Sequence, residues 1–156
     1  MRLGLAVAVL AALVDQAAKL GVLRLFTADG PHIMPVLPVL NFALTLNRGM
    51  SFGLFNTGSA MNALVFTLIA AVIVAALLVW LARAQDALLR IAIGLVVGGA
   101  IGNVIDRLAR GAVIDFLDFH VGPYHWFVFN LADAAISVGV GLMIIDGLRG
   151  RREPRN

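Results

Sequence analysis

The chain has 156 residues, of which 61% are hydrophobic and only 13% are charged. Soluble domains are about 45–50% apolar and about 25% charged, so this composition predicts a single-domain membrane protein. The absence of cysteine excludes disulfides, thiolate nucleophiles and cysteine-ligated zinc. The net charge of +3 does not indicate nucleic acid binding, because the arginines lie at the ends of apolar runs. We therefore expect membrane lipids, and no nucleic acid, among the partners.

Four apolar stretches are long enough to cross a bilayer as helices, which takes about 20 residues. They lie at about 3 to 23, 59 to 82, 87 to 105 and 130 to 148. The first stretch is similar to a secretory signal, but Asp15, Gln16 and Lys19 stand where a cleavage site of small residues should be, so we expect a mature helix. The predicted fold is an all-α membrane protein, one domain over residues 1 to 156.

The arginines predict the orientation of these spans, because basic residues are enriched in cytoplasmic loops and tails. Seven of them fall on one side of the predicted membrane, namely Arg2, Arg83, Arg90, Arg149, Arg151, Arg152 and Arg155. Four fall on the other side, namely Arg24, Arg48, Arg107 and Arg110. Both termini are therefore predicted to be cytoplasmic, with extracytoplasmic segments at about 24 to 58 and 106 to 129.

The two extracytoplasmic segments predict a small β-rich part with a lid. The pattern of Val39 to Leu46 predicts a strand, followed by a tight turn at Asn47-Arg48-Gly49. Ala112 to Phe119 is rich in β-branched and aromatic residues. Asn41 to Asn56 combines glycines, which make the backbone flexible, with apolar side chains that can rest on lipid or on acyl chains. We expect this last segment to be a mobile lid over a site, with a rigid interfacial sheet as the alternative.

Three groups of polar residues interrupt the apolar spans, and all three approach the predicted outer face. The groups are Asp15, Gln16 and Lys19; Asn103, Asp106 and Arg107; and Asn130 and Asp133. Ionisable residues inside a membrane are costly and usually mark a functional site. Their convergence is the main evidence in the sequence for one.

Structural roles explain several of these residues equally well. Asp15 and Lys19 have the i,i+4 spacing of an ion pair on one helical face. Asp106-Arg107 fits an ordinary helix end at the interface, and Asn103 fits an interhelical hydrogen bond.

An aspartate pair is the sharpest chemical hypothesis. Asn130 is placed to cap the last helix, and Asp133 then occupies its first turn, but capping alone does not require Asp133. Asp115 and Asp118 both compete to be its partner, and strand alternation puts them on opposite faces. The residues alone leave that choice open. Two carboxylates sharing a site would hold one proton between them and act as general base and general acid on a water.

Other chemistries have weaker support in the sequence. The histidines, at positions 32, 120 and 125, form no zinc-helix motif, so we predict no metal and no cofactor. A serine hydrolase would have to use Lys19, the only lysine, with a serine that no local motif joins to it. The main alternative is a small four-helix transporter, in which buried ionisable residues would couple to protons or cations.

Five segments together resemble the lipoprotein signal peptidase family, also called type II signal peptidases. They occur in family order over nearly the whole chain: Asp15 to Lys19, Asn47 to Phe52, Gly102 to Arg107, Val113 to Phe116 and Phe129 to Asp133. One departure is Met50, which stands where the family usually has a small residue.

The resemblance implies an aspartic endopeptidase of the bacterial inner membrane. Separately from the resemblance, we expect a monomer. It would remove signal peptides from prolipoproteins, cleaving before a cysteine that carries diacylglyceryl. The family's catalytic aspartates fall on Asp115 and Asp133, which favours Asp115 over Asp118. The supporting or substrate-binding positions fall on Asp15, Lys19, Asn47, Arg48, Gly49, Asn103, Asp106, Arg107 and Asn130.

Overall fold

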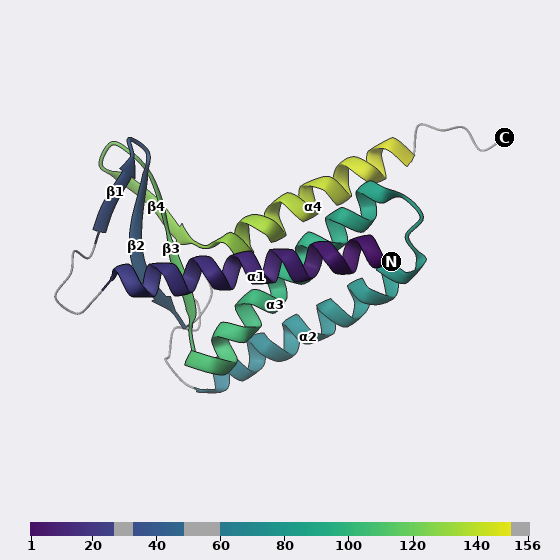
Figure 1. Cartoon of the computed structure of the whole chain (residues 1–156), viewed down its shortest axis with the longest axis horizontal. Coiled ribbons are helices and arrows are strands. Elements are labelled where there is room, and N and C mark those ends of the chain that lie inside the picture. Colours follow the sequence, from purple (N-terminus) through teal and green to yellow (C-terminus); the bar gives the residue numbers. More distant parts are fainter. Residues whose placement is uncertain (27–32, 49–59, 151–156) are drawn as a thin grey trace.

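The structure is a computed structural model that describes residues 1–26, 33–48 and 60–150. Its helices are α1 (Arg2–Leu25), α2 (Ala60–Arg83), α3 (Ala87–Arg110) and α4 (Leu131–Gly150). Its strands are β1 (Ile33–Leu37), β2 (Leu40–Asn47), β3 (Val113–Val121) and β4 (Tyr124–Phe129). All four helices are long and apolar enough to cross a membrane. Figure 1 shows the sheet at one end of the helix bundle, and the start of α1 and end of α4 at the other.

Three of the predicted spans match their helices to within two residues at each end, whereas α3 runs five residues beyond the predicted end at 105. Asp106 and Arg107 therefore lie inside α3, four and three residues before its last residue. Gly111 caps the C-terminal end of α3: its φ of 71° is left-handed, and its N–H donates to the Arg107 carbonyl. Arg110 supports the added turn through an i,i+4 ion pair with Asp106, at 3.0 Å.

α3 is the central helix: it contacts the other three and is the most buried of them. Its glycines allow close approach, since a methyl group at Gly98 would overlap the Ala8 carbonyl and one at Gly99 would overlap the Ala132 carbonyl. The small residues thus bring both α1 and α4 close to α3, and α1 and α4 also contact each other. This packing places the polar residues of the three helices near one another.

The strands form one antiparallel sheet in the order β1-β2-β3-β4. β3 pairs with β2 through Thr45 opposite Asp115, and with β4 through Leu117 opposite Phe129. The sheet packs on the end of α1 through a small core of Val22, Ile114 and Phe116. The predicted strands at 39 to 46 and 112 to 119 correspond to β2 and β3. The part of the predicted lid from residue 49 to 56 lies outside the described residues.

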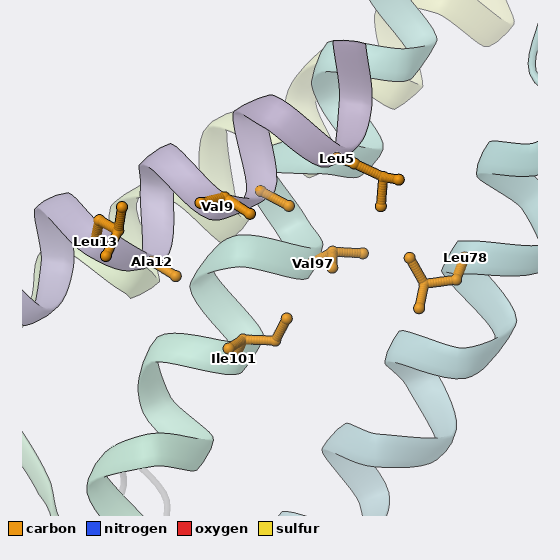
Figure 2. A pocket seen from close by; sticks show the side chains of 8 residues that line it. Leu5, Val9, Ala12, Leu13, Leu78, Val97 and Ile101 are labelled. Atoms are coloured by element: carbon orange, nitrogen blue, oxygen red, sulfur yellow. The ribbon is translucent and has the colours of Figure 1, made fainter. Parts of the chain in front are cut away.

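An apolar pocket of about 290 Å³ opens between α1, α2 and α3 (Figure 2). In the view of Figure 2, Leu78 of α2 lies across from Val97 and Ile101 of α3. Its lining consists only of alanine, valine, leucine and isoleucine: Leu5, Ala8, Val9, Ala12, Leu13, Leu78, Val97 and Ile101. Such a pocket can hold hydrocarbon, but its lining has no group for chemistry, so the candidate active site lies elsewhere.

Candidate active site

The three polar groups predicted from the sequence come together where the sheet meets α1, α3 and α4. Lys19 Nζ of α1 lies 2.8 Å from Asp15 Oδ2 and 2.7 Å from Asp106 Oδ2. It also donates to Asn103 Oδ1 of α3 at 3.1 Å. We call Asp15, Lys19, Asn103 and Asp106 the Lys19 cluster. The predicted ion pair of Asp15 and Lys19 is confirmed.

The Lys19 cluster is almost fully shielded from solvent, and its charges are paired. Asp15, Lys19 and Asp106 are buried completely. Asp106 accepts from the Ile114 N–H at 3.2 Å and from Arg110 at 3.0 Å, so it joins α1, α3 and β3. The reading of Asp106 as an ordinary helix end at the interface is therefore wrong. A buried ion pair costs desolvation and survives only with such additional partners.

Asp133 lies in the first turn of α4 and is positioned by two asparagines. Asn130 Oδ1 accepts from the Asp133 N–H at 2.9 Å, which confirms Asn130 as the cap of α4. Asn103 Nδ2 donates to Asp133 Oδ1 at 2.8 Å, which confirms the interhelical role of Asn103. Asp15 Oδ1 accepts from the Ala132 N–H at 2.9 Å, so the Lys19 cluster also contacts this turn directly.

Asp115 extends from β3 toward the same asparagines. Asn130 Nδ2 donates to Asp115 Oδ1 at 2.6 Å, and Asn47 Nδ2 of β2 donates to Asp115 Oδ2 at 2.9 Å. Asn130 Nδ2 also donates to Asn103 Oδ1 at 3.2 Å. Asn103 and Asn130 therefore form a two-amide bridge between the carboxylates of Asp115 and Asp133.

Burial raises the pKa of Asp115 to about 6. The nearby Asp133 carboxylate adds to the rise, while hydrogen bonds from Asn47 and Asn130 and the charge of Lys19 oppose it. An aspartate whose pKa lies this close to neutrality exchanges a proton more readily than an ordinary surface aspartate. The arrangement therefore has the components of acid–base chemistry.

Asp118 lies apart from this bridge. Its carboxylate accepts from Asn41 Nδ2 at 3.1 Å and lies 2.8 Å from His125 Nδ1. We call Asn41, Asp118 and His125 the Asp118 cluster. Burial raises the pKa of Asp118, but the hydrogen bonds with His125 and Asn41 outweigh this effect and hold the pKa below its ordinary value. Of the two competing aspartates, Asp115 has the contacts that link it to Asp133.

The remaining predicted site residues lie at the edge of this arrangement. Arg107 is partly buried, with its guanidinium 5.4 Å from the centre of the Phe66 ring on α2. Arg48 is exposed, next to Asn47 at the end of β2. Gly49 lies outside the described residues.

Sequence reasoning missed several contributors. The arginine pattern predicts only an orientation for Arg110, although its i,i+4 spacing from Asp106 is also typical of an ion pair. Gly102 borders the site, since a methyl group there would lie 2.5 Å from Asp15 Oδ2. The partnership of Asn41 with Asp118 depends on the register of β2 and β3, which no local pattern indicates.

The family model for signal peptidase (SPase) II matches residues 7–149 of the chain. The chain belongs to the signal peptidase II family. The lipoprotein signal peptidase of Rhodopseudomonas palustris (strain TIE-1) is 43% identical over 154 residues, covering 96% of this chain and 94% of that protein. The one of Nitrobacter hamburgensis is 44% identical over 150 residues, covering 94% of this chain and 92% of that protein.

Two solved structures of bacterial membrane enzymes have the same fold as this signal peptidase II chain. One has a TM-score of 0.82 at 28% identity and covers 98% of this chain and 93% of its own. The other has a TM-score of 0.77 at 30% identity, covering 93% and 92%. The chain is thus a multi-pass membrane peptidase, and the alternative of a small transporter is not favoured.

Proposed function

We propose that this chain is an aspartic endopeptidase that removes signal peptides from prolipoproteins, with Asp115 and Asp133 as its catalytic pair. Cleavage falls before the cysteine that carries diacylglyceryl. The observation that supports this pair is the two-amide bridge, in which Asn130 donates to Asp115 at 2.6 Å and Asn103 donates to Asp133 at 2.8 Å. Membership of the signal peptidase II family supports the substrate.

The two carboxyl groups share one proton during the reaction, because neighbouring carboxylates do not both ionise without a large cost. The ionised member takes a proton from a water, whose oxygen bonds to the scissile carbonyl carbon. The protonated member gives its proton to the carbonyl oxygen. When the resulting diol collapses, the C–N bond breaks, the leaving amine takes up a proton from the pair, and one diol hydroxyl returns its proton to the pair, which restores the starting state.

The asparagines orient the carboxylates. Asn103 Oδ1 accepts from both Lys19 and Asn130, so its Nδ2 is the group that faces Asp133. Asn130 is held in the same way, because its Oδ1 accepts from the Asp133 N–H. Each amide thus has one possible orientation, and each presents an N–H to a catalytic oxygen. Asn47 supplies a further donor to Asp115.

The proposed site suits a substrate that is held in the membrane. It lies where β3 meets the start of α4, at the sheet end of the bundle (Figure 1). With both termini cytoplasmic, the site faces the extracytoplasmic side of the bacterial inner membrane. Reporter fusions after Asn156 and in the β3–β4 turn test this, because the proposal expects opposite sides for the two reporters.

Other parts of the chain complete the proposal. Arg107, Arg48 and Gly49 are proposed to contact the substrate or lipid headgroups, and Asn41 to Asn56 to form the lid. The enzyme acts as a monomer among membrane lipids, without nucleic acid, metal or cofactor. A chelator is expected to leave cleavage intact, and activity that is lost and then restored by zinc would contradict this part.

The decisive test is cleavage by the purified enzyme in lipid nanodiscs. The substrate is a fluorescent peptide with a diacylglyceryl-cysteine, and the same peptide without the lipid is the control. We expect cleavage before the lipidated cysteine and a large loss of rate on the unmodified peptide. Equal rates on both peptides would show that the enzyme does not recognise the lipid. A folded enzyme that cleaves neither peptide would contradict the proposed function.

A further inference from the structure

The hairpin of β3 and β4 has two chemically different faces because of a β-bulge. Asp118 pairs with Val128, whereas His120 pairs with His125. Between these pairs, one residue of β3, Phe119, stands opposite two residues of β4, Trp126 and Phe127. A bulge of this kind interrupts strand alternation and turns two consecutive side chains to the same face.

The first face is aromatic. The Phe119 and Trp126 rings lie 5.6 Å apart, and the Phe127 and Phe129 rings lie 5.8 Å apart. Val121 and Tyr124 pair at the end of the hairpin, on the same face by alternation from Phe119. We call Phe119, Val121, Tyr124, Trp126 and Phe127 the aromatic face.

Toward the turn of the hairpin, the opposite face carries polar side chains. The rings of His120 and His125 stack at 5.0 Å, and His125 contacts Asp118 at 2.8 Å. His120 also contacts the Gly122 carbonyl at 3.2 Å. The hairpin is thus amphipathic across its thickness.

The aromatic face is exposed well beyond what a protein surface in water usually tolerates. The exposed fractions are 54% for Val121, 75% for Tyr124, 68% for Trp126 and 53% for Phe127. Residues 119–129 contain no lysine, arginine, aspartate or glutamate. A contiguous apolar patch of this kind marks an interaction surface. Tryptophan and tyrosine are the residues enriched at the boundary between headgroups and hydrocarbon.

The position of the hairpin indicates which surface covers it. β4 ends at Phe129, and the membrane-spanning part of α4 begins at Leu131, so only Asn130 separates the two. The strands run across the direction of the helices in Figure 1, so the hairpin extends sideways from this boundary. The aromatic face is therefore joined, through Phe129 and Asn130, to a helix that is long and apolar enough to cross a membrane.

We propose that the aromatic face of the β3–β4 hairpin lies in the headgroup–hydrocarbon boundary of the membrane leaflet on the sheet side, as an interfacial anchor. The anchor fixes the depth of β3, and with it the depth of Asp115. This consequence for cleavage rests on the proposed function, because a lipidated substrate holds its scissile bond at one depth in the bilayer. The membrane contact itself does not depend on the proposed function.

The chain offers a direct test because it has only two tryptophans, Trp80 and Trp126. The Trp80→Phe variant leaves Trp126 in its native hairpin as the only tryptophan. The Trp126→Phe variant leaves Trp80, which is 46% exposed near the other end of the bundle, as a matched reference. Both variants are reconstituted in phosphatidylcholine–phosphatidylglycerol vesicles. Their fluorescence is then quenched by aqueous iodide, by a spin label near the lipid headgroup and by bromines near the chain ends.

We expect the headgroup-proximal label to quench Trp126 more strongly than the deep bromines, with little quenching by iodide. Strong iodide quenching without lipid quenching would overturn the anchor. This measurement needs no cleavage, so its failure is separate from a failure of the proposed function.

A second measurement distinguishes lipid from substrate as the occupant of the aromatic face. Trp126→Ser is compared with His125→Gln on the polar face, using the lipidated peptide in nanodiscs and in detergent micelles. The anchor predicts that Trp126→Ser loses cleavage rate in nanodiscs but keeps it in micelles, while His125→Gln loses little in either. An equal loss in both media would assign the face to the substrate, and tryptophan-dependent dimers would assign it to a second copy; either result would overturn the proposal.

Discussion

The Lys19 cluster in the helix bundle and the Asp118 cluster on the sheet both surround a buried aspartate with nitrogen donors. In the Lys19 cluster, Asn103 receives a hydrogen bond from Lys19 and donates one to Asp133. In the Asp118 cluster, Asn41 donates to Asp118, and the second partner is the half-exposed His125. Burial and polar partners are thus common to both clusters. What distinguishes them is the connection to the Asp115–Asp133 pair.

The largest effect is expected from matched aspartate-to-asparagine substitutions. Asp115→Asn and Asp133→Asn are each expected to lower cleavage roughly 10³-fold or more, because an amide keeps the shape but neither accepts the proton of water nor holds the shared proton. Asp118→Asn is the matched control from the same strand and is expected to have a mild effect. The measurement is the single-turnover rate of folded enzyme in nanodiscs. Near wild-type cleavage by Asp133→Asn would contradict the catalytic pair.

The second comparison removes one asparagine from each cluster. Asn103→Ala removes the donor to Asp133 Oδ1 and leaves Lys19 without one of its acceptors, so kcat is expected to fall about 10- to 100-fold. Asn41→Ala removes only the donor to Asp118 and is expected to lower stability slightly, with kcat nearly unchanged. Steady-state kinetics with the lipidated peptide check both values. Equal losses of kcat in the two variants would show that the two-amide bridge makes no specific contribution to catalysis.

Much of the helix bundle, including the Lys19 cluster, could be predicted from the sequence. Hydropathy, capping and i,i+4 spacing are local patterns, and they identified the four spans, the Asn130 cap and the pairing of Asp15 with Lys19. The extension of α3 to Arg110 cannot be predicted in this way, because charged residues indicate a helix end, whereas here Arg110 continues the helix and pairs with the buried Asp106.

The sheet and the Asp118 cluster could be predicted less well, because they depend on contacts between distant segments. Alternation separates Asp115 from Asp118, but it does not say which face of β3 meets the start of α4. That choice depends on the strand register and on the packing of Ile114 and Phe116 against Val22, which are contacts between distant segments. The bulge opposite Phe119 depends on register in the same way.

The third comparison tests whether the Lys19 cluster supports the catalytic pair through packing. In Gly102→Ala the new methyl group lies 2.5 Å from Asp15 Oδ2, which pairs with Lys19. Overpacking of this kind costs about 1–3 kcal/mol, so we expect a lower melting temperature in detergent together with slower cleavage. Gly21→Ala in α1 is the matched control, since a methyl group there has no atom within 4 Å. A fully active and stable Gly102→Ala enzyme would show that Asp15 moves freely.

The smallest expected effect is a change in the proton affinity of Asp115. Because burial and the neighbouring Asp133 raise its pKa to about 6, Asp115 is protonated below that pH and ionised above it. Asp133→Asn removes a nearby negative charge, so the pKa of Asp115 is expected to fall, while burial keeps it above the ordinary value. The infrared C=O band of the protonated acid, titrated with pH and assigned by its loss in Asp115→Asn, measures this shift.

Asp118 serves as an internal comparison. Burial raises the pKa of Asp118, but its hydrogen bonds with His125 and Asn41 hold that pKa below the ordinary value. Asp118 is therefore ionised near pH 6 and contributes no band there. If the pKa of Asp115 is unchanged in Asp133→Asn, the two carboxylates do not interact. This result would contradict the proposal that they share a proton.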